Sequence, residues 1–280
     1  MLSITLFFLL LKEYNCVYVW PQNNESFALL RNRTFEGKLP ISNNGIDSRK
    51  FVRPVYWDWR TEGKVSPVKD QGHCAASWAF SAVANIESQL RIHKMRDEIL
   101  SEQFLIDCDE AQTGCECRSI VATFGHIVAT LGGVLRDVDY CPYHEERGQC
   151  RWEPSKLGKL NKNPKLVPVT GFQKVLPDEE VMAQFVYEKG PLSAAINSAS
   201  MKRYKGDIDE PTAENCDPNY LDHAVLIVGY NVYVSESGEE TPYWIIKNSW
   251  GKDWGDEGYY YLVSGRNACG IASDVSIAYV

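Results

Sequence analysis

The chain has 280 residues, of which 44% are hydrophobic and 12% aromatic, which is enough apolar side chain for a packed core. Its formal net charge is −8 and it has no cluster of Lys and Arg, which argues against nucleic acid or an anionic membrane surface as a partner. These properties predict a globular protein and exclude basic binding modules.

The chain begins with an apolar run, Met1 to Leu11, that Lys12 ends, and this pattern is typical of a secretory signal peptide. A spanning helix needs about 20 apolar residues, so stable membrane insertion is not expected. We expect residues 1–18 to be a signal peptide and the polar residues 19–51 to be a short pro-segment or lead. Glycosylation sequons at Asn24 and Asn32 fit a protein that is secreted, extracellular or in a lysosome-like compartment.

Helical patterns come first in the rest of the chain. Apolar residues recur at helical spacing after Ser77, so Ser77 should lie in the first turn of a long buried helix. Three further helices are expected, at 101–108, 120–131 and 178–190. Short β-prone runs follow, at 192–196, 224–230, 243–247, 259–263 and 275–279. Helices followed by strands predict an α+β protein with a helical half and a sheet half.

Three motifs lie in order along the chain: QGHCAASW (71–78), LDHAV (221–225) and KNSWG (247–251). Together they resemble the papain family of cysteine peptidases, the cathepsin-like enzymes, whose nucleophile segment reads C-G-[SA]-C-[WY]. The resemblance covers the chain from the segment near Trp57 to its end. Ser77 stands where the family carries its nucleophilic cysteine.

The resemblance implies a papain-like two-lobed fold over residues 52–280, with an active-site cleft between a helical lobe and a β-barrel-like sheet lobe. It also implies that Ser77, His223 and Asn248 form the catalytic group. Gln71 would donate a hydrogen bond in the oxyanion hole. Trp250 would cover the pair formed by His223 and Asn248.

Family position also suggests how a substrate would bind. Ala195, Leu221 and Asp274 would line the second substrate pocket, and Asp274 would favour a basic side chain there. Arg118 stands where the family has a glycine, whose open backbone binds an extended substrate as an added strand. We therefore expect the side chain of Arg118 to narrow or redirect this part of the cleft.

Nine cysteines in a secreted chain indicate disulfides, and eight of them remain once Cys16 leaves with the signal peptide. The resemblance implies three bridges, Cys74–Cys115, Cys108–Cys150 and Cys216–Cys269. The two cysteines left over, Cys117 and Cys141, would form a fourth. A zinc site from Cys108, Cys115, Cys117 and His144 is the rival interpretation, but it lacks C-x2-C spacing. Neither a metal nor a cofactor is expected.

Serine changes what this catalytic group can do. A free thiol has a pKa of about 8.5, which falls to about 3–4 in papain, whereas a hydroxyl cannot be ionised in this way. Any attack by Ser77 would need His223 to remove its proton, with the neutral Asn248 in place of a carboxylate. The favoured interpretation is a pseudoprotease with lost or strongly reduced proteolytic activity.

Such a protein would act as a monomer that binds a ligand in its cleft: a peptide, a protein such as a cystatin-type inhibitor, or a carbohydrate-bearing surface. One alternative is a serine-nucleophile hydrolase, or a condensing enzyme resembling silicateins, that uses Ser77, His223 and Asn248. Another is a sequencing or gene-model error in an ordinary cysteine protease. The sequence leaves these alternatives open.

Overall fold

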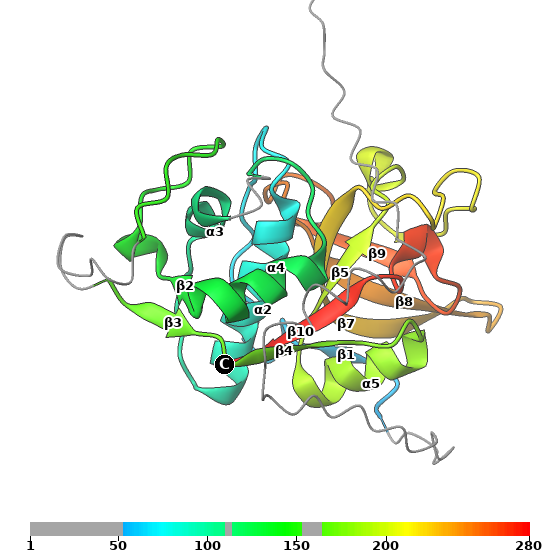
Figure 1. The fold of residues 1–280 in the computed structure, drawn as a ribbon. Helices are drawn as coiled ribbons and strands as arrows, with labels where there is room; N and C mark the ends of the chain where they lie inside the picture. The colour runs from blue at the N-terminus through cyan, green and yellow to red at the C-terminus, as the bar shows by residue number, and fades with distance from the viewer. Residues whose placement is uncertain (1–52, 110–113, 153–163) are drawn as a thin grey trace, which may run out of the picture.

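The computed structural model of the protein describes residues 53–109, 114–152 and 164–280 (Figure 1). The predicted signal peptide, the predicted lead and both sequons lie outside these residues. None of the helices in the described part of the chain has the length and apolar character needed to cross a membrane.

The helical lobe is built on α2 (Ser77–His93), α3 (Glu102–Cys108) and α4 (Ile120–His126), which continues as a π-helical turn, η1 (Ile127–Leu131). The side chains of Ser101 and Ser119 accept hydrogen bonds from backbone N–H groups at the starts of α3 and α4. Gly132 ends η1 at a φ of 73°, a conformation that glycine adopts without strain. The lobe is completed by β2 (Gly133–Leu135), η2 (Asp137–Asp139) and β3 (Leu166–Pro168), with β2 and β3 paired.

The sheet lobe contains one large sheet in the order β4-β10-β5-β7-β8-β9-β6, with β1 paired to β7. All pairings are antiparallel except that of β6 with β9. The strands are β1 (Trp57–Asp58), β4 (Gly171–Lys174), β5 (Leu192–Ile196), β6 (Ile208–Asp209), β7 (His223–Val234), β8 (Glu240–Lys247), β9 (Tyr259–Val263) and β10 (Val275–Tyr279). Helix α5 (Glu179–Lys189) packs on this lobe, and two short 3-10 turns, η4 (Met201–Arg203) and η5 (Ala268–Gly270), lie in its loops.

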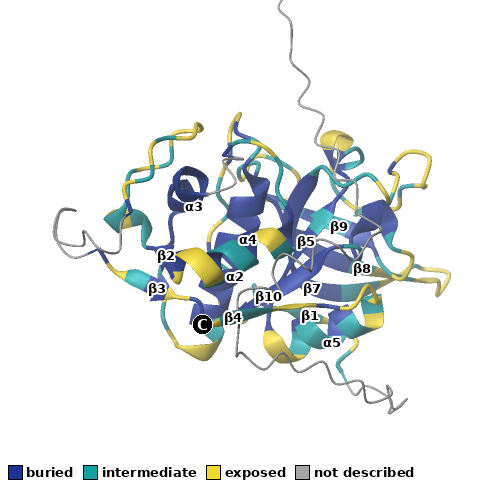
Figure 2. Ribbon diagram, viewed as in Figure 1, coloured by how far each residue is buried: buried dark blue, intermediate teal, exposed yellow. Residues whose placement is uncertain are grey.

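Each lobe has its own apolar core. One core joins the sheet to α5, and the other joins α2, α3 and α4. A small third cluster, made by Ala84 of α2 with Leu226, Val228 and Ile245 of the sheet, joins the two lobes. Figure 2 shows α3 and the inner strands as buried, and the outer sides of α4 and α5 as partly exposed. The predicted α+β, two-lobed fold is therefore confirmed.

The predicted helices all form, and the predicted strands at 192–196, 259–263 and 275–279 coincide with β5, β9 and β10. The strands β7 and β8 are longer than predicted, because they continue as an exposed hairpin beyond the core. Among the strands that were not predicted, β4 is partly exposed along its length, and a strand this short and exposed shows little hydrophobic alternation.

Three disulfides join the residues that the resemblance indicates: Cys74–Cys115, Cys108–Cys150 and Cys216–Cys269. The predicted bridge between Cys117 and Cys141 is wrong, since Cys141 is a free cysteine. The two sulfurs lie in different surroundings. Cys141 Sγ is 3.9 Å from a carboxylate oxygen of Asp107, whereas Cys117 Sγ is 3.3 Å from the carbonyl oxygen of Asp222.

Candidate active site

Ser77 is the first residue of α2, and only 4% of its surface is exposed. Its N–H has no acceptor within the helix, because the first turn of an α-helix leaves such groups free. The Ser77 hydroxyl oxygen accepts a hydrogen bond from the backbone N–H of Ala224, at 3.1 Å. The helix start therefore places Ser77 directly against the beginning of β7 in the other lobe.

His223 is the first residue of β7, and 8% of its surface is exposed. Its Nε2 lies 2.8 Å from Asn248 Oδ1, which leaves Nδ1 as the ring nitrogen available for proton exchange. Trp250 covers the ring at a centroid distance of 4.8 Å, and Trp254 packs edge-on against Trp250. The predicted cover over His223 is thus present.

The surroundings of His223 favour the neutral form of its ring. Burial lowers the pKa of His223, and the hydrogen bond to Asn248 and the charge of Asp222 oppose this effect only in part. A neutral imidazole can accept a proton, as a general base must. However, Ser77 and His223 form no hydrogen bond with each other, although both line one pocket in the described structure.

Gln71 is buried, and both ends of its side-chain amide are held. Its Nε2 donates to the carbonyl oxygen of Cys74 at 2.8 Å, and its Oε1 accepts from the Ser249 hydroxyl at 2.7 Å. The Tyr143 hydroxyl donates to the Gln71 carbonyl oxygen at 2.6 Å. An amide NH₂ has two hydrogens, so one remains for a ligand oxygen. Ser249 belongs to the third motif but was not singled out from the sequence.

A small pocket beside Ser77 brings together most of the predicted ligand-contacting residues. It is lined by Ser77, Arg118, Ser119, Ala195, Leu221, His223 and Asp274, with Cys117, Asp222 and Ala224. Asn248 and Trp250 contact His223 from outside the lining, whereas Gln71 is held by Cys74 and Ser249. Residues that the sequence placed far apart therefore meet at one pocket between the lobes.

Asp274 is an acid with a half-satisfied carboxylate in this pocket. It is 1% exposed, and its Oδ2 accepts a hydrogen bond from the Ser119 hydroxyl at 3.2 Å, while Oδ1 is buried without a partner. Burial raises the pKa of Asp274. The charge of Lys174 and hydrogen bonds from Ser119 and the Ile120 N–H oppose this effect, and a cationic side chain placed in the pocket would likewise favour the ionised carboxylate.

Arg118 lines the pocket, but its charged end is already engaged. The guanidinium forms an ion pair with the buried Asp109 and lies 5.9 Å from the centre of the Trp78 ring. Only 11% of the Arg118 side chain is exposed. Within the described residues, neither the N–H nor the C=O of Arg118 forms a backbone hydrogen bond, as a surface for strand addition requires.

The zinc interpretation is wrong, because the sulfurs of Cys108 and Cys115 are each bonded to another cysteine. Across residues 53–109, 114–152 and 164–280, no other group of metal-binding side chains is found.

Comparison with known proteins gives a consistent result. The sequence matches the family described as "Papain family cysteine protease" over residues 53–279. Cysteine proteinase 1 of Dictyostelium discoideum is 36% identical over 258 residues, which is 88% of this chain and 71% of that protein. Cathepsin F of Mus musculus is 37% identical over 229 residues, 82% of this chain and 46% of the relative. A viral cathepsin of Spodoptera litura multicapsid nucleopolyhedrovirus is 39% identical over 229 residues, 81% of this chain and 62% of its own length.

Two of these relatives are therefore matched over less than two thirds of their length. Solved structures agree with the sequence matches. Digestive procathepsin L 3 from the larval midgut of Tenebrio molitor has a TM-score of 0.71 at 33% identity, with 84% of this chain and 72% of that one covered. The bromelain protease of Ananas comosus, in complex with the E64 inhibitor, has a TM-score of 0.69 at 33% identity, with 81% and 100% covered.

Proposed function

The chain belongs to the papain family of cysteine proteases, and from this we propose that it is a family member with lost or strongly reduced proteolytic activity that binds a ligand in its cleft. The observation that supports this most directly concerns Ser77. Its hydroxyl oxygen accepts a hydrogen bond from the Ala224 N–H and none from, or to, His223. The nucleophile position is thus occupied by a neutral group that is not paired with a base.

Catalysis by this group would meet two obstacles. A cysteine at position 77 would already be ionised to a thiolate before the substrate bound. The Ser77 hydroxyl, in contrast, must lose its proton during its attack on the substrate. The resulting imidazolium would be buried beside the neutral Asn248 rather than a carboxylate. In serine proteases, replacing the triad aspartate with asparagine lowers kcat by about 10⁴-fold. We therefore expect peptide hydrolysis near background.

The ligand that fits the cleft best is an extended peptide, or a protein segment, with a basic side chain. Arg118 and Asp274 line the same pocket; Arg118 forms no backbone-to-backbone hydrogen bond among the described residues, and Asp274 supplies a carboxylate. A cystatin-type inhibitor would present such a segment. Disulfides support an oxidising compartment, so we propose a secreted, extracellular or lysosome-like protein that acts as a monomer.

One observation favours the alternative of a serine-nucleophile hydrolase, or a condensing enzyme resembling silicateins. Burial lowers the pKa of His223, which favours the neutral form that a general base needs. In that case Ser77 would first turn its hydroxyl toward His223, with Asn248 orienting the ring. The oxyanion would form near Gln71.

A serine-directed phosphonofluoridate probe separates the two functions. We expect the native protein to remain unlabelled and to leave fluorogenic dipeptides intact, while calorimetry detects binding of a peptide with arginine at the second position. Labelling of Ser77 that disappears in the His223→Ala variant would establish the hydrolase instead. Asp274→Asn serves as the matched control for binding, because it keeps the shape of the side chain and removes its charge.

A further inference from the structure

Two short segments from opposite lobes pair with each other beside the active site. The Gln71 N–H donates to the Ser249 carbonyl at 2.8 Å, and the Gly251 N–H donates to the Lys69 carbonyl at 3.2 Å. Between these bonds, Asp70 and Trp250 form an antiparallel bridge. We call residues 69–71 and 249–251 the inter-lobe ladder.

The ladder carries several groups of the candidate active site. Gln71 is on its first strand, while Ser249, whose hydroxyl holds the Gln71 amide, is on its second. Trp250 covers His223, and Asn248 directly precedes the ladder. Any slip between the two strands would move the amide of Gln71 relative to His223.

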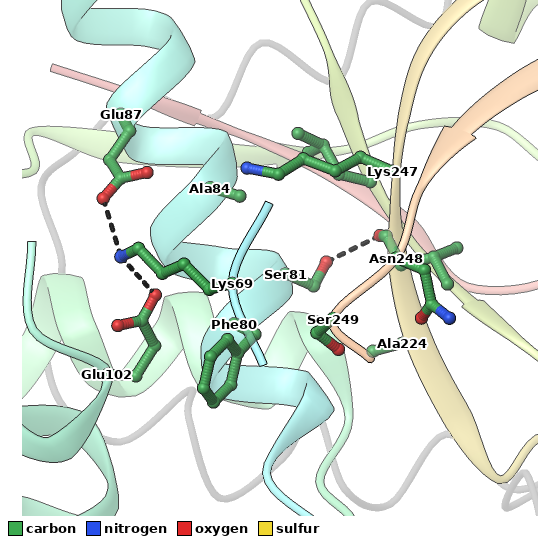
Figure 3. Close-up of a pocket in the computed structure, with 12 residues that line it drawn as sticks. Lys69, Phe80, Ser81, Ala84, Glu87, Glu102, Ala224, Lys247, Asn248 and Ser249 are labelled. Carbon is green, nitrogen blue, oxygen red and sulfur yellow. Dashed lines mark hydrogen bonds and ion pairs between the residues drawn. The ribbon is translucent and has the colours of Figure 1, made fainter. Parts of the chain in front are cut away.

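A buried charge cluster anchors the first strand. Lys69 Nζ lies 3.0 Å from Glu87 Oε1 and 2.6 Å from Glu102 Oε1 (Figure 3). It also donates a hydrogen bond to the Leu100 carbonyl at 3.1 Å. Burial by itself lowers the pKa of Lys69, but the two carboxylates outweigh it and hold that pKa above its usual range. The ammonium is therefore charged and bound by both helices, α2 through Glu87 and α3 through Glu102.

A second lysine reaches the same cavity from the other lobe. Lys247 ends β8, is 5% exposed, and donates to the Ser66 hydroxyl at 3.0 Å. Glu87 Oε2 is buried without a hydrogen-bond partner among the described residues, and both Lys247 and Glu87 line a small cavity between α2 and the sheet. Figure 3 shows Lys247 extending from the sheet toward Ala84, and Lys69 extending toward Glu87 and Glu102. Each strand of the ladder thus has a lysine on or near it that is directed into this cavity.

Glu87 lies on the same helix that begins at Ser77. An ion pair from Lys69 to Glu87 therefore fixes the strand of Gln71 against the helix of Ser77 without passing through the cleft. A charge pair whose carboxylates are buried on two helices restricts such a strand more than exposed ion pairs do, because solvent screens exposed pairs.

We propose that Lys69, held by Glu87 and Glu102, is a positioning residue for the active site: it fixes the inter-lobe ladder and so sets the Gln71 amide relative to Ser77. Lys247 lines the same cavity from the sheet lobe, where it is held by its hydrogen bond to Ser66. The inference rests on the proposed function only in taking Gln71 as the donor to a ligand oxygen. The positioning itself is a property of the fold.

Amide hydrogen exchange, followed by NMR, tests the positioning without any activity. Lys69→Met should increase the exchange rates of the Gln71 and Gly251 N–H groups at least tenfold, while amides of β5 and β7 keep their rates. Lys64→Met is the matched control, since Lys64 donates to the Arg91 carbonyl and takes no part in the ladder. Unchanged rates at Gln71 and Gly251 in folded Lys69→Met would overturn the proposal.

Removing Lys69 leaves two buried carboxylates without their ammonium, which is strongly destabilising. If Lys69→Met does not fold, Glu102→Gln supplies the test, because it keeps an acceptor oxygen and removes one charge. It should raise the same two exchange rates by a smaller factor, severalfold at least, and unchanged rates would count against the proposal.

A peptide aldehyde and the matching peptide alcohol connect the ladder to ligand binding. In the Ser77→Cys background, where a thiol can add to the aldehyde, only the aldehyde gives a tetrahedral adduct whose oxygen reaches the Gln71 amide, so adding Lys69→Met should weaken aldehyde binding about tenfold and leave alcohol binding unchanged. Equal weakening of both would indicate a purely structural role and contradict the proposal. If the native protein binds neither compound, the proposed function fails, and the exchange rates still decide the positioning.

Discussion

Replacing Ser77 with cysteine should restore peptidase activity. The substitution puts a thiol at the first position of α2, where no acidic residue occupies the first turn and the helix dipole favours an anion. His223 is the neighbouring base. Burial now lowers the pKa of His223, and the negative charge of a nearby thiolate would raise it. The remaining groups, Gln71 and Asn248, need not move.

The size of the effect follows from ionisation. At pH 6 a thiol with a pKa of about 8.5 is about 0.3% thiolate, whereas one with a pKa of about 4, as in papain, is about 99% thiolate. Ionisation before binding removes the need for His223 to accept a proton in a buried site without a carboxylate, a defect of up to about 10⁴-fold. We expect kcat/KM to rise at least about 10³-fold, or about 4 kcal/mol in transition-state stabilisation.

The assay is cleavage of a fluorogenic dipeptide with a basic second residue, together with labelling by a thiol-directed epoxide. Cys141 is a free cysteine, so both proteins should be prepared with Cys141→Ser to remove background labelling. Ser81→Cys is the matched control. It places a thiol one turn further along the same helix, where the present hydroxyl donates to the Val225 carbonyl, and it should give neither labelling nor cleavage.

A Ser77→Cys variant that folds with its three described disulfides and still fails to react with the epoxide would refute this reasoning. The arrangement of His223 and Asn248 would then be insufficient to ionise a thiol. In that case the catalytic interpretation of both residues would have to be abandoned, and the binding function would stand alone.

Three further predictions concern the pocket and the thiols. Arg118→Gly removes a buried ion pair with Asp109, so it should destabilise the fold by about 3–5 kcal/mol in urea unfolding and leave peptide affinity by calorimetry unchanged; tighter binding would show that the side chain obstructs the groove. Burial raises the pKa of Asp274, so the preference of Ser77→Cys for a basic over a neutral second residue should grow as pH rises through that pKa and the carboxylate ionises, and the preference should vanish in Asp274→Asn. A ratio of kcat/KM for the basic and the neutral substrate that does not change with pH would contradict this. Burial also raises the pKa of Cys141, so iodoacetamide should alkylate it slowly at pH 7 and faster above pH 9, as peptide mass mapping can follow; rapid labelling at pH 7 would be inconsistent with that environment.

Local sequence signals predicted the elements that depend on local contacts. The start of α2 at Ser77 and the end of α5 at Gly190 follow from hydrophobic spacing and glycine, which act within a few residues. One expectation failed because it depended on distant contacts: Cys141 was paired with Cys117 only because both were left over. The ion pair that Arg118 forms with Asp109 was not anticipated from the sequence, and the effect of Arg118 on the cleft stays a prediction.

The sequence by itself determined the order of the motifs, the α+β class and which residue types stand at the catalytic positions. Only the tertiary structure decided which atoms meet there. The Ala224 N–H reaches Ser77 across 147 positions of the chain, and the Ser119 hydroxyl reaches Asp274 across 155. Such contacts depend on how two separate cores pack against each other, and the spacing of hydrophobic residues within one segment does not predict that packing.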